Sequence, residues 1–238
     1  MRDPASTSRT ARKARTRDEL KRAARTCFAR RGYPETQIAD IARAAGVAQG
    51  TLYVHFASKE AILDELLAEL DAELVARLAT AWSALSSGAP GGRAPDLAAR
   101  VRTLAGECLA VWHDHRELLR AFADRATLGL DVRRLHDGVS PGAARWVHAL
   151  LERAAGELGL AVSHPELVGH ALLGMWMRVG LFSLFDETVS RAELAELLTR
   201  LTLGALGAAA APAAARRAPV PTAVRTARRR RPSPRSRT

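Results

Sequence analysis

Cysteine, aromatic residues and long apolar runs are all scarce in this sequence. The 238 residues include two cysteines, Cys27 and Cys108, which are too few for a disulfide framework and are interpreted as buried thiols of a reducing compartment. The longest apolar run, near 171–185, is interrupted by Arg178 and is shorter than the ~20 residues that cross a bilayer. No apolar stretch follows the basic N-terminus, which argues against a signal peptide. We therefore expect a cytoplasmic protein with no membrane partner.

Spacings typical of catalytic or metal-binding sites are also missing. There is no glycine-rich phosphate loop, no CxxC pair, and no Ser or Cys nucleophile with a base at a telling spacing. His113-Asp114-His115 resembles a fragment of a metal site, but it falls at an expected turn between helices, and a solvated turn is the better interpretation. We predict that the chain is not an enzyme and uses no metal and no cofactor.

Acidic residues are depleted at both ends of the chain, and this uneven charge separates the tails from the rest. The formal net charge is +11, of which residues 1–17 carry +5 and residues 208–238 carry +9 without an acid. Residues 18–207 are left with −3, so the high isoelectric point belongs to the tails. Because neither tail has many large apolar side chains to bury, we expect a disordered basic arm over 1–15 and a disordered Arg-rich tail over 208–238.

Two short apolar patterns on either side of Gly46 carry most of the information about function. Ile38 and Ile41 lie one helical turn apart before Gly46, and Leu52 and Phe56 are four residues apart after it. Gly46 suits the left-handed residue that ends a helix. A helix, a short turn containing glycine and a second helix make the helix–turn–helix motif.

The outward positions of the second helix are polar and free of acid, since no Asp or Glu lies between Asp40 and Glu60. A solvated helix usually mixes both signs of charge, so this segment favours a surface that faces phosphate. The side chains there that can donate hydrogen bonds to a phosphate or a base edge are Gln49, Thr51, Tyr53, His55 and Lys59.

At these residues the sequence resembles a known family. TLYVHFASKEAIL at 51–63, with FARRGYPETQIADIARAAGVAQG before it, is similar to the DNA-binding domain of the tetracycline-repressor (TetR) family of bacterial regulators. The match is ungapped over roughly 17–67, and beyond it only the helical layout agrees. The resemblance implies an all-α fold with an N-terminal three-helix DNA-binding domain and a C-terminal helical domain for ligand binding and dimerisation.

The resemblance makes the helix near 49–56 the recognition helix, which lies in the major groove. Gln49 is then the candidate for base reading, because its amide can pair bidentately with adenine. Gly50 permits close approach to the groove, and Val54 can touch a thymine methyl. Ala48 departs from the Ser or Thr that caps this helix in many relatives, a loss of about 1 kcal/mol. Alternatively, Gln49 is only a solvated residue and reads no base.

The resemblance also implies phosphate contacts, which fix register without reading sequence. The matching positions are Thr51, Tyr53, His55 and Lys59, and Thr36 would offer its hydroxyl and a helix N-terminus to a phosphate across the groove. Alternatively, Tyr53 is a packing residue and His55 is a surface residue without a binding role.

Capping residues and apolar stripes divide the chain into four parts. Thr16-Arg17-Asp18-Glu19 reads as a capping box that starts the first helix. Ser58 would cap a long helix from Lys59 to about residue 82, whose single apolar face suggests a rigid connector. We expect the arm over 1–15, the DNA-binding domain over 16–64, the helical regulatory domain over 65–207 and the tail over 208–238.

In the TetR family the last two long helices pair with those of a second copy, which implies a homodimer here. The helix near 166–185 is apolar almost all round and must be covered on more than one side; burial within its own protomer is the alternative. The expected interface residues are Leu167, Leu172, Trp176, Val179, Leu194, Leu198 and Leu201.

The family's middle helices usually enclose a small-molecule pocket, so the resemblance also implies an effector site. Its candidate residues are Trp112, Phe122, Trp146, His148, Met175, Trp176 and Arg178. Alternatively, the aromatic and Met residues among them belong to the ordinary core, and Arg178 forms an ion pair with Asp186 or Glu187 instead of binding an effector.

We therefore expect a transcriptional regulator, a repressor that binds a palindromic double-stranded operator as a homodimer and leaves it when an unknown small molecule binds. The alternative is an architectural, non-specific DNA-binding protein that is driven by its basic tails and has no effector. The N-terminal arm, through Arg9, Arg12, Lys13 and Arg15, would reach a neighbouring groove or serve only as a solubilising tail. The C-terminal tail would anchor DNA non-specifically or be an inert extension.

Overall fold

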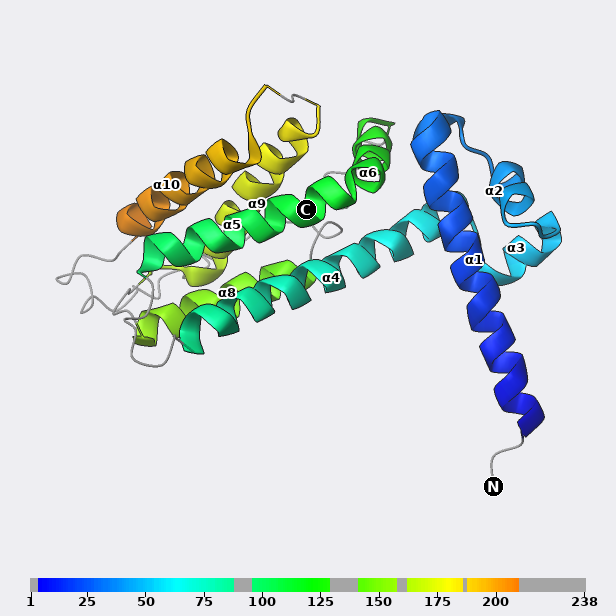
Figure 1. Ribbon diagram of the computed structural model, residues 1–238, viewed down its shortest axis with the longest axis horizontal. Helices are drawn as coiled ribbons and strands as arrows, with labels where there is room; N and C mark the ends of the chain where they lie inside the picture. Colours follow the sequence, from blue (N-terminus) through cyan, green and yellow to red (C-terminus); the bar gives the residue numbers. More distant parts are fainter. Residues whose placement is uncertain (1–3, 88–95, 129–140, 158–161, 186–187, 210–238) are drawn as a thin grey trace, which may run out of the picture.

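The computed structural model describes residues 4–87, 96–128, 141–157, 162–185 and 188–209, and the elements in these ranges are all α-helices (Figure 1). The predicted all-α class is confirmed. In chain order the helices are α1 (Pro4–Glu35), α2 (Ile38–Ala44), α3 (Gln49–His55), α4 (Lys59–Ser87), α5 (Leu97–Asp114), α6 (Arg116–Leu128), α8 (Pro141–Glu157), α9 (Pro165–Ser183) and α10 (Arg191–Ala209). Of the tail expected over 208–238, residues 208 and 209 are the end of α10, and residues 210–238 lie outside the described residues.

The turn between α2 and α3 has the geometry that its sequence predicts. Gly46 has a φ of +68°, in the left-handed region. Its N–H donates to the carbonyl of Arg43 at 3.1 Å, and the N–H of Val47 donates to Ala42 at 3.0 Å, the bond pattern that closes a helix at a left-handed residue. Val47 then packs against the core, so one glycine both ends α2 and sets the direction in which α3 starts.

Helix α1 begins earlier than its capping residues predict. Residues 4–15, expected as a disordered arm, are the first turns of α1, and Thr16 lies inside the helix rather than at its start. Between Pro4 and Gly32 there is neither proline nor glycine, so nothing in the chain breaks the helix, and proline is tolerated in a first turn. Gly32, with a φ of +76° in the left-handed region, interrupts the helix near its C-terminal end.

Helix α4 connects the two halves of the molecule (Figure 1). The Ser58 hydroxyl accepts from the N–H of Ala61 at 3.3 Å, as its capping role predicts, and the helix runs one turn further than expected, to Ser87. One face is buried along its length; its members are Ile62, Leu63, Leu66, Leu67, Leu70, Leu74, Leu78 and Trp82. The first turns of this face cover the core of α1–α3, and the later turns pack among α5 and α8.

A buried carboxylate joins α4 to α8. Asp71 of α4 accepts from the backbone N–H groups of Gly142 at 2.8 Å and Ala143 at 3.1 Å. These are first-turn groups of α8, which have no partner within their own helix. Asp71 therefore caps a helix that lies some 70 residues further along the chain, and it fixes α8 against the connector.

Helices α9 and α5 approach closely at Gly180, and this contact generates a stability prediction. A methyl group at Gly180 would lie 1.9 Å from ring carbons of Trp112, whereas one at Gly174, also in α9, would meet nothing within 4 Å. We expect Gly180→Ala to lower the free energy of unfolding by about 1–3 kcal/mol through overpacking. Gly174→Ala should raise it by about 0.5–1 kcal/mol through helix propensity. Chemical denaturation of both variants checks this; equal effects would contradict the contact.

Candidate functional site

Helix α3 is held by its inner face and presents its other side to solvent. Leu52 is fully buried and Phe56, just after the helix, is 3% exposed. Tyr53 is 53% exposed and Val54 71% exposed. Gln49, Gly50 and Thr51 are exposed as well, and nothing lies within 4 Å of the space beside Gly50.

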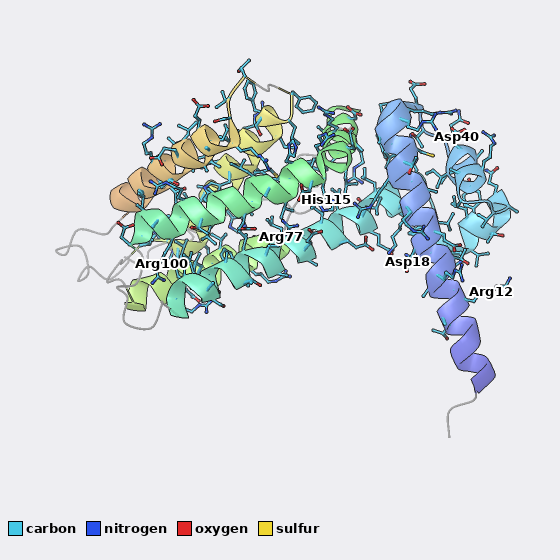
Figure 2. All side chains as sticks on the ribbon, viewed as in Figure 1. Arg12, Asp18, Asp40, Arg77, Arg100 and His115 are labelled. Atoms are coloured by element: carbon cyan, nitrogen blue, oxygen red, sulfur yellow. The ribbon has the colours of Figure 1, made fainter. Side chains whose placement is uncertain are left out.

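Every predicted base-reading position is thus open to a partner, including an unusually exposed valine. The helix–turn–helix lies at one end of the molecule, with α2 and α3 outside α1 (Figure 2). Ala48 provides no side-chain cap to α3, as its residue type predicts.

Arg17 of α1 fixes the C-terminal end of α3. Its guanidinium donates to the backbone carbonyl of His55, lies 4.0 Å above the Phe56 ring and forms a two-pronged pair with the Glu65 carboxylate of α4. The hydrogen bond from Arg17 is the main reason that the pKa of Glu65 is lowered. One cation therefore joins α1, α3 and α4. The sequence placed Arg17 in a capping box, and no local signal pointed to this role.

Thr36 is not a phosphate contact. Its side chain is fully buried, and its hydroxyl donates to the carbonyl of Gly32 at 2.7 Å, with Cys27 O at 3.3 Å. The residue at the N-cap of α2 is Gln37, whose backbone N–H donates to Asp40 Oδ2 at 3.2 Å. Thr36 thus closes the bend after α1 from inside.

Lys59 also has a different partner from the one expected. Its ammonium donates to the carbonyls of Tyr33, Pro34 and Thr36 at 2.8, 3.1 and 2.9 Å and lies 4.5 Å from the centre of the Tyr33 ring. All three N–H donors of the ammonium are engaged. Lys59 therefore ties the end of α1 and the residue after it to the start of α4, and its ammonium is not free for a phosphate.

His55 is half-buried beside two cations. Its Nδ1 is enclosed and has no hydrogen-bond partner among the described residues. Burial, and then the charges of Lys13 and Arg17, lower the pKa of its imidazole. The ring is therefore held neutral near pH 7 and adds no positive charge to the outer face of α3.

The comparisons with known proteins agree with this geometry. Residues 20–66, from the core of α1 into α4, match the family described as bacterial regulatory proteins of the tetR family. Residues 20–66 are therefore a DNA-binding domain of the TetR family. Because this family consists of regulatory proteins, the match also supports the expectation that the chain is not an enzyme.

One curated relative is similar over the DNA-binding domain alone. The chain is 51% identical to the HTH-type transcriptional repressor KstR2 of Rhodococcus jostii over 55 residues, which are 23% of this chain and 27% of the relative. The chain thus spans about a quarter of the length of that relative.

The whole fold resembles solved TetR-like structures. The fatty acid degradation regulator FadR of Bacillus halodurans aligns with a TM-score of 0.63 and 22% identity over 79% of this chain and 95% of its own. FadR of Bacillus subtilis, solved in complex with stearoyl-CoA, aligns with a TM-score of 0.61 and 18% identity over 79% and 97%. At these identities the likeness is one of fold.

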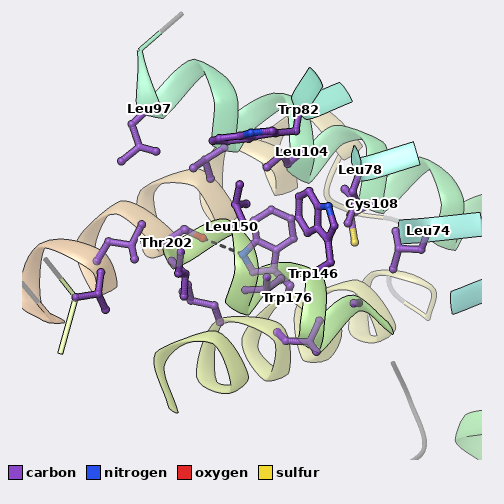
Figure 3. Close-up of a pocket in the computed structure, with 18 residues that line it drawn as sticks. Leu74, Leu78, Trp82, Leu97, Leu104, Cys108, Trp146, Leu150, Trp176 and Thr202 are labelled. Carbon is purple, nitrogen blue, oxygen red and sulfur yellow. Dashed lines mark hydrogen bonds between the residues drawn. The ribbon is translucent and has the colours of Figure 1, made fainter. Parts of the chain in front are cut away.

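The helical half that follows the DNA-binding domain contains an apolar cavity of about 90 Å³ between α4, α5, α8, α9 and α10 (Figure 3). Among its lining, the Thr202 hydroxyl accepts from Trp176 Nε1 at 2.8 Å. The other lining residues are Leu74, Leu78, Trp82, Leu97, Val101, Leu104, Cys108, Ala143, Trp146, Val147, Leu150, Leu151, Val162, Leu172, Leu173 and Leu206. No charged side chain is among them, so the cavity suits hydrocarbon rather than a polar group.

The structure divides the predicted effector residues. Trp146 and Trp176 line the cavity, whereas Trp112 and Phe122 border a separate void of about 20 Å³ nearer the DNA-binding domain. The other three do not line the cavity: His148 approaches Glu152 at 3.6 Å, Met175 packs in a neighbouring cluster, and Arg178 is exposed. The sequence could not separate them because α9 is apolar on nearly every side. The suggested Arg178 partners, Asp186 and Glu187, lie outside the described residues.

The predicted interface residues also fall into two groups. Leu172, Leu194 and Leu198 are buried within the protomer, Trp176 lines the cavity and Val179 packs on the core, so these five do not form an outer surface. Leu167 and Leu201 are exposed, by 69% and 42%. Four further apolar residues on α9, on α10 and on the link between them are exposed, although the sequence did not predict them at an interface: Phe182, Phe185, Val189 and Leu197.

Two further findings concern the described ranges alone. No helix there is long and apolar enough to cross a membrane. Within the same ranges, no three His, Cys, Asp or Glu side chains are grouped as metal ligands.

His115, expected in a solvated turn, is half-buried, with Nδ1 at 3.2 Å from Arg25 of α1 and Nε2 at 3.0 Å from Glu73 of α4.

The contrast between Thr36 and Thr51 generates a prediction, because one is interior and the other faces out. Thr36→Val should lower the free energy of unfolding by about 1 kcal/mol, since a buried carbonyl loses its hydroxyl partner, and should leave DNA affinity unchanged. Thr51→Val should alter stability by less than about 0.5 kcal/mol but weaken DNA binding. Thermal unfolding and a DNA-binding titration of both variants separate the roles. Weaker DNA binding by folded Thr36→Val than by Thr51→Val would restore Thr36 to the interface.

Proposed function

We propose that this protein is a transcriptional repressor that binds a palindromic operator as a homodimer and leaves it when an apolar small molecule enters the cavity. The observation that carries this proposal is the exposed face of α3 in a TetR-family DNA-binding domain. The one curated relative described above, KstR2, is named a transcriptional repressor. Such a protein acts in the cytoplasm, where bacterial DNA lies.

Base reading falls to the start and middle of α3. Gln49 has the amide that pairs bidentately with adenine, and the exposed methyl groups of Val54 suit a thymine methyl. Gly50 leaves room for the helix to approach base edges. Thr51 and the Tyr53 hydroxyl can donate to phosphates beside the groove.

The dimer is supported by the exposed apolar residues of α9 and α10. Single exposed apolar residues are ordinary on a protein surface, but six that gather on two adjacent helices and their link indicate a contact surface. A second copy is the partner proposed, because one recognition helix reads too few base pairs for selectivity in a genome. Two copies related by a twofold axis would present their α3 helices to two half-sites.

The effector proposed is a molecule with a hydrocarbon portion, since the cavity lining is apolar. The stearoyl-CoA bound to FadR of Bacillus subtilis supports an acyl chain as one such portion. At about 90 Å³ the cavity is smaller than the roughly 150 Å³ of an engineered apolar protein cavity that binds benzene. A ligand of that kind would have to displace lining side chains, and so move helices.

Helix α4 provides the coupling in this proposal. Leu74, Leu78 and Trp82 line the cavity, and Leu63 and Leu66 of the same helix are buried with the DNA-binding domain. A ligand that favours an arrangement of α4 unsuited to the operator lowers operator affinity by the ratio of its own affinities for the two arrangements.

Operator recognition is tested first by mapping bound DNA across the genome of the native host. We expect a few symmetric sites, which would also show that two copies bind together. Broad binding without a shared sequence would instead favour the architectural alternative.

On a duplex taken from such a site, Gln49→Ala should weaken binding about 10-fold, because a bidentate base contact contributes about 1–3 kcal/mol. Binding to a scrambled duplex should not change, and a fluorescence-anisotropy titration measures both. An equal loss on both duplexes would remove Gln49 from base reading.

The cavity is tested with stearoyl-CoA as the probe. The wild-type protein should lose about 5- to 150-fold in operator affinity when the probe is saturating, the usual range of coupling between two sites. Leu150→Trp, which fills the cavity, should abolish this response, and Leu150→Ala, which enlarges it, should retain it.

Thermal unfolding of both Leu150 variants establishes that each variant is folded when its loss of operator affinity with stearoyl-CoA is measured. A wild type that binds stearoyl-CoA, seen as a raised melting temperature, with unchanged operator affinity would refute the coupling. Loss of the response in both variants alike would place the probe elsewhere.

A further inference from the structure

The backbone of the first turns of α1 projects beyond the rest of the molecule (Figure 1). Residues 10–15 are all exposed, and the first fully buried side chain of the helix is Leu20. Residues 4–15 therefore form about 18 Å of helix, at 1.5 Å per residue, that extends beyond the core. Figure 1 shows these turns continuing past α3. Because residues 10–15 are all exposed, packing within the protomer does not account for the length of this extension.

The charge of this extension is of one sign. Residues 4–17 contain five Lys and Arg and no acid. Arg15 is paired with Glu19 at 3.0 Å and Arg17 with Glu65. Arg12 and Lys13 are exposed and form no ion pair with any residue that the structure describes. These two adjacent cations, the α1 basic pair, are thus available to a partner.

The α1 basic pair lies on the same side of the molecule as the recognition helix. Arg17, one turn further along α1, contacts the end of α3 through the carbonyl of His55. Lys13 is near enough for its charge to act on the His55 imidazole. Figure 2 shows Arg12 directed from α1 toward the side on which α3 lies. DNA that receives α3 in its major groove would therefore continue beneath the first turns of α1.

We propose that the α1 basic pair, Arg12 and Lys13, binds the phosphate backbone that flanks each half-site. This inference rests on the proposed DNA-binding function and adds a second contact surface to it. A helix about 10–12 Å in diameter is too wide for a minor groove of about 6 Å, so the extension lies across phosphates instead of reading bases. It therefore supplies affinity and orientation but no sequence preference.

The test compares full-length Arg12→Ala/Lys13→Ala with Arg15→Ala, which removes a cation that is already paired on the same helix. Alanine favours helix at each position, and matching melting temperatures establish that the variants fold alike. Binding is titrated on an operator duplex and on a scrambled duplex between 50 and 200 mM salt.

Each lost phosphate contact lowers the slope of log K against log salt by about 0.9, and the double variant loses four such contacts per dimer, so its slope should be smaller by about 4. Between 50 and 200 mM salt, the affinity of the double variant should therefore fall by a factor about 100-fold smaller than that of the wild type. The loss of affinity should be the same on both duplexes, so the preference for operator is retained. Arg15→Ala should keep the wild-type slope. Hydroxyl-radical footprints should show wild-type protection outside each half-site that the double variant lacks.

An unchanged slope and footprint in the double variant would overturn the proposal. A loss confined to the operator duplex would also overturn it, because it would mean base reading. A wild type with no preference for any sequence would be a failure of the proposed function instead, and the slope on the scrambled duplex would still decide whether Arg12 and Lys13 bind phosphate.

Discussion

The buried face of α4 is the constraint on which the rest of the structure depends. Leu63 and Leu66 complete the core under the helix–turn–helix, and two or three turns later Leu74 and Leu78 complete the wall of the cavity. A close-packed helix cannot be displaced at one end without effect on its neighbours at the other. Arg17 and Asp71 strengthen this arrangement, since each ties a different helix to α4.

Features of the fold that depend on neighbours in sequence were predictable. The spacing of Leu52 and Phe56 gave the inner face of α3, and Gly46 gave the turn before it, because both follow from helix geometry and backbone freedom. The start of α1 was mispredicted, although Thr16 and Glu19 have the residue types of a cap, because no residue before them breaks a helix. A capping pattern marks a start only where the preceding backbone leaves the helix.

Features that depend on distant partners were not predictable. Thr36 and Lys59 carry donors that would suit a phosphate, but backbone carbonyls at and just after the C-terminal end of α1 accept from them instead. On α9, apolar residues occupy nearly every position, so the sequence could not tell which would face the cavity, the core or the surface. His115 likewise acquires its contacts with Arg25 and Glu73 only when three helices meet.

The internal use of the Lys59 ammonium affects how quickly a protein of this kind could search a chromosome. With Lys59 engaged and His55 neutral, the outer face of α3 carries little charge of its own. Attraction to any phosphate backbone then comes from cations elsewhere, which hold DNA loosely and permit sliding. A recognition surface with little charge binds unrelated sequences weakly. Sliding along DNA and specific binding at a target site would then depend on different parts of the chain.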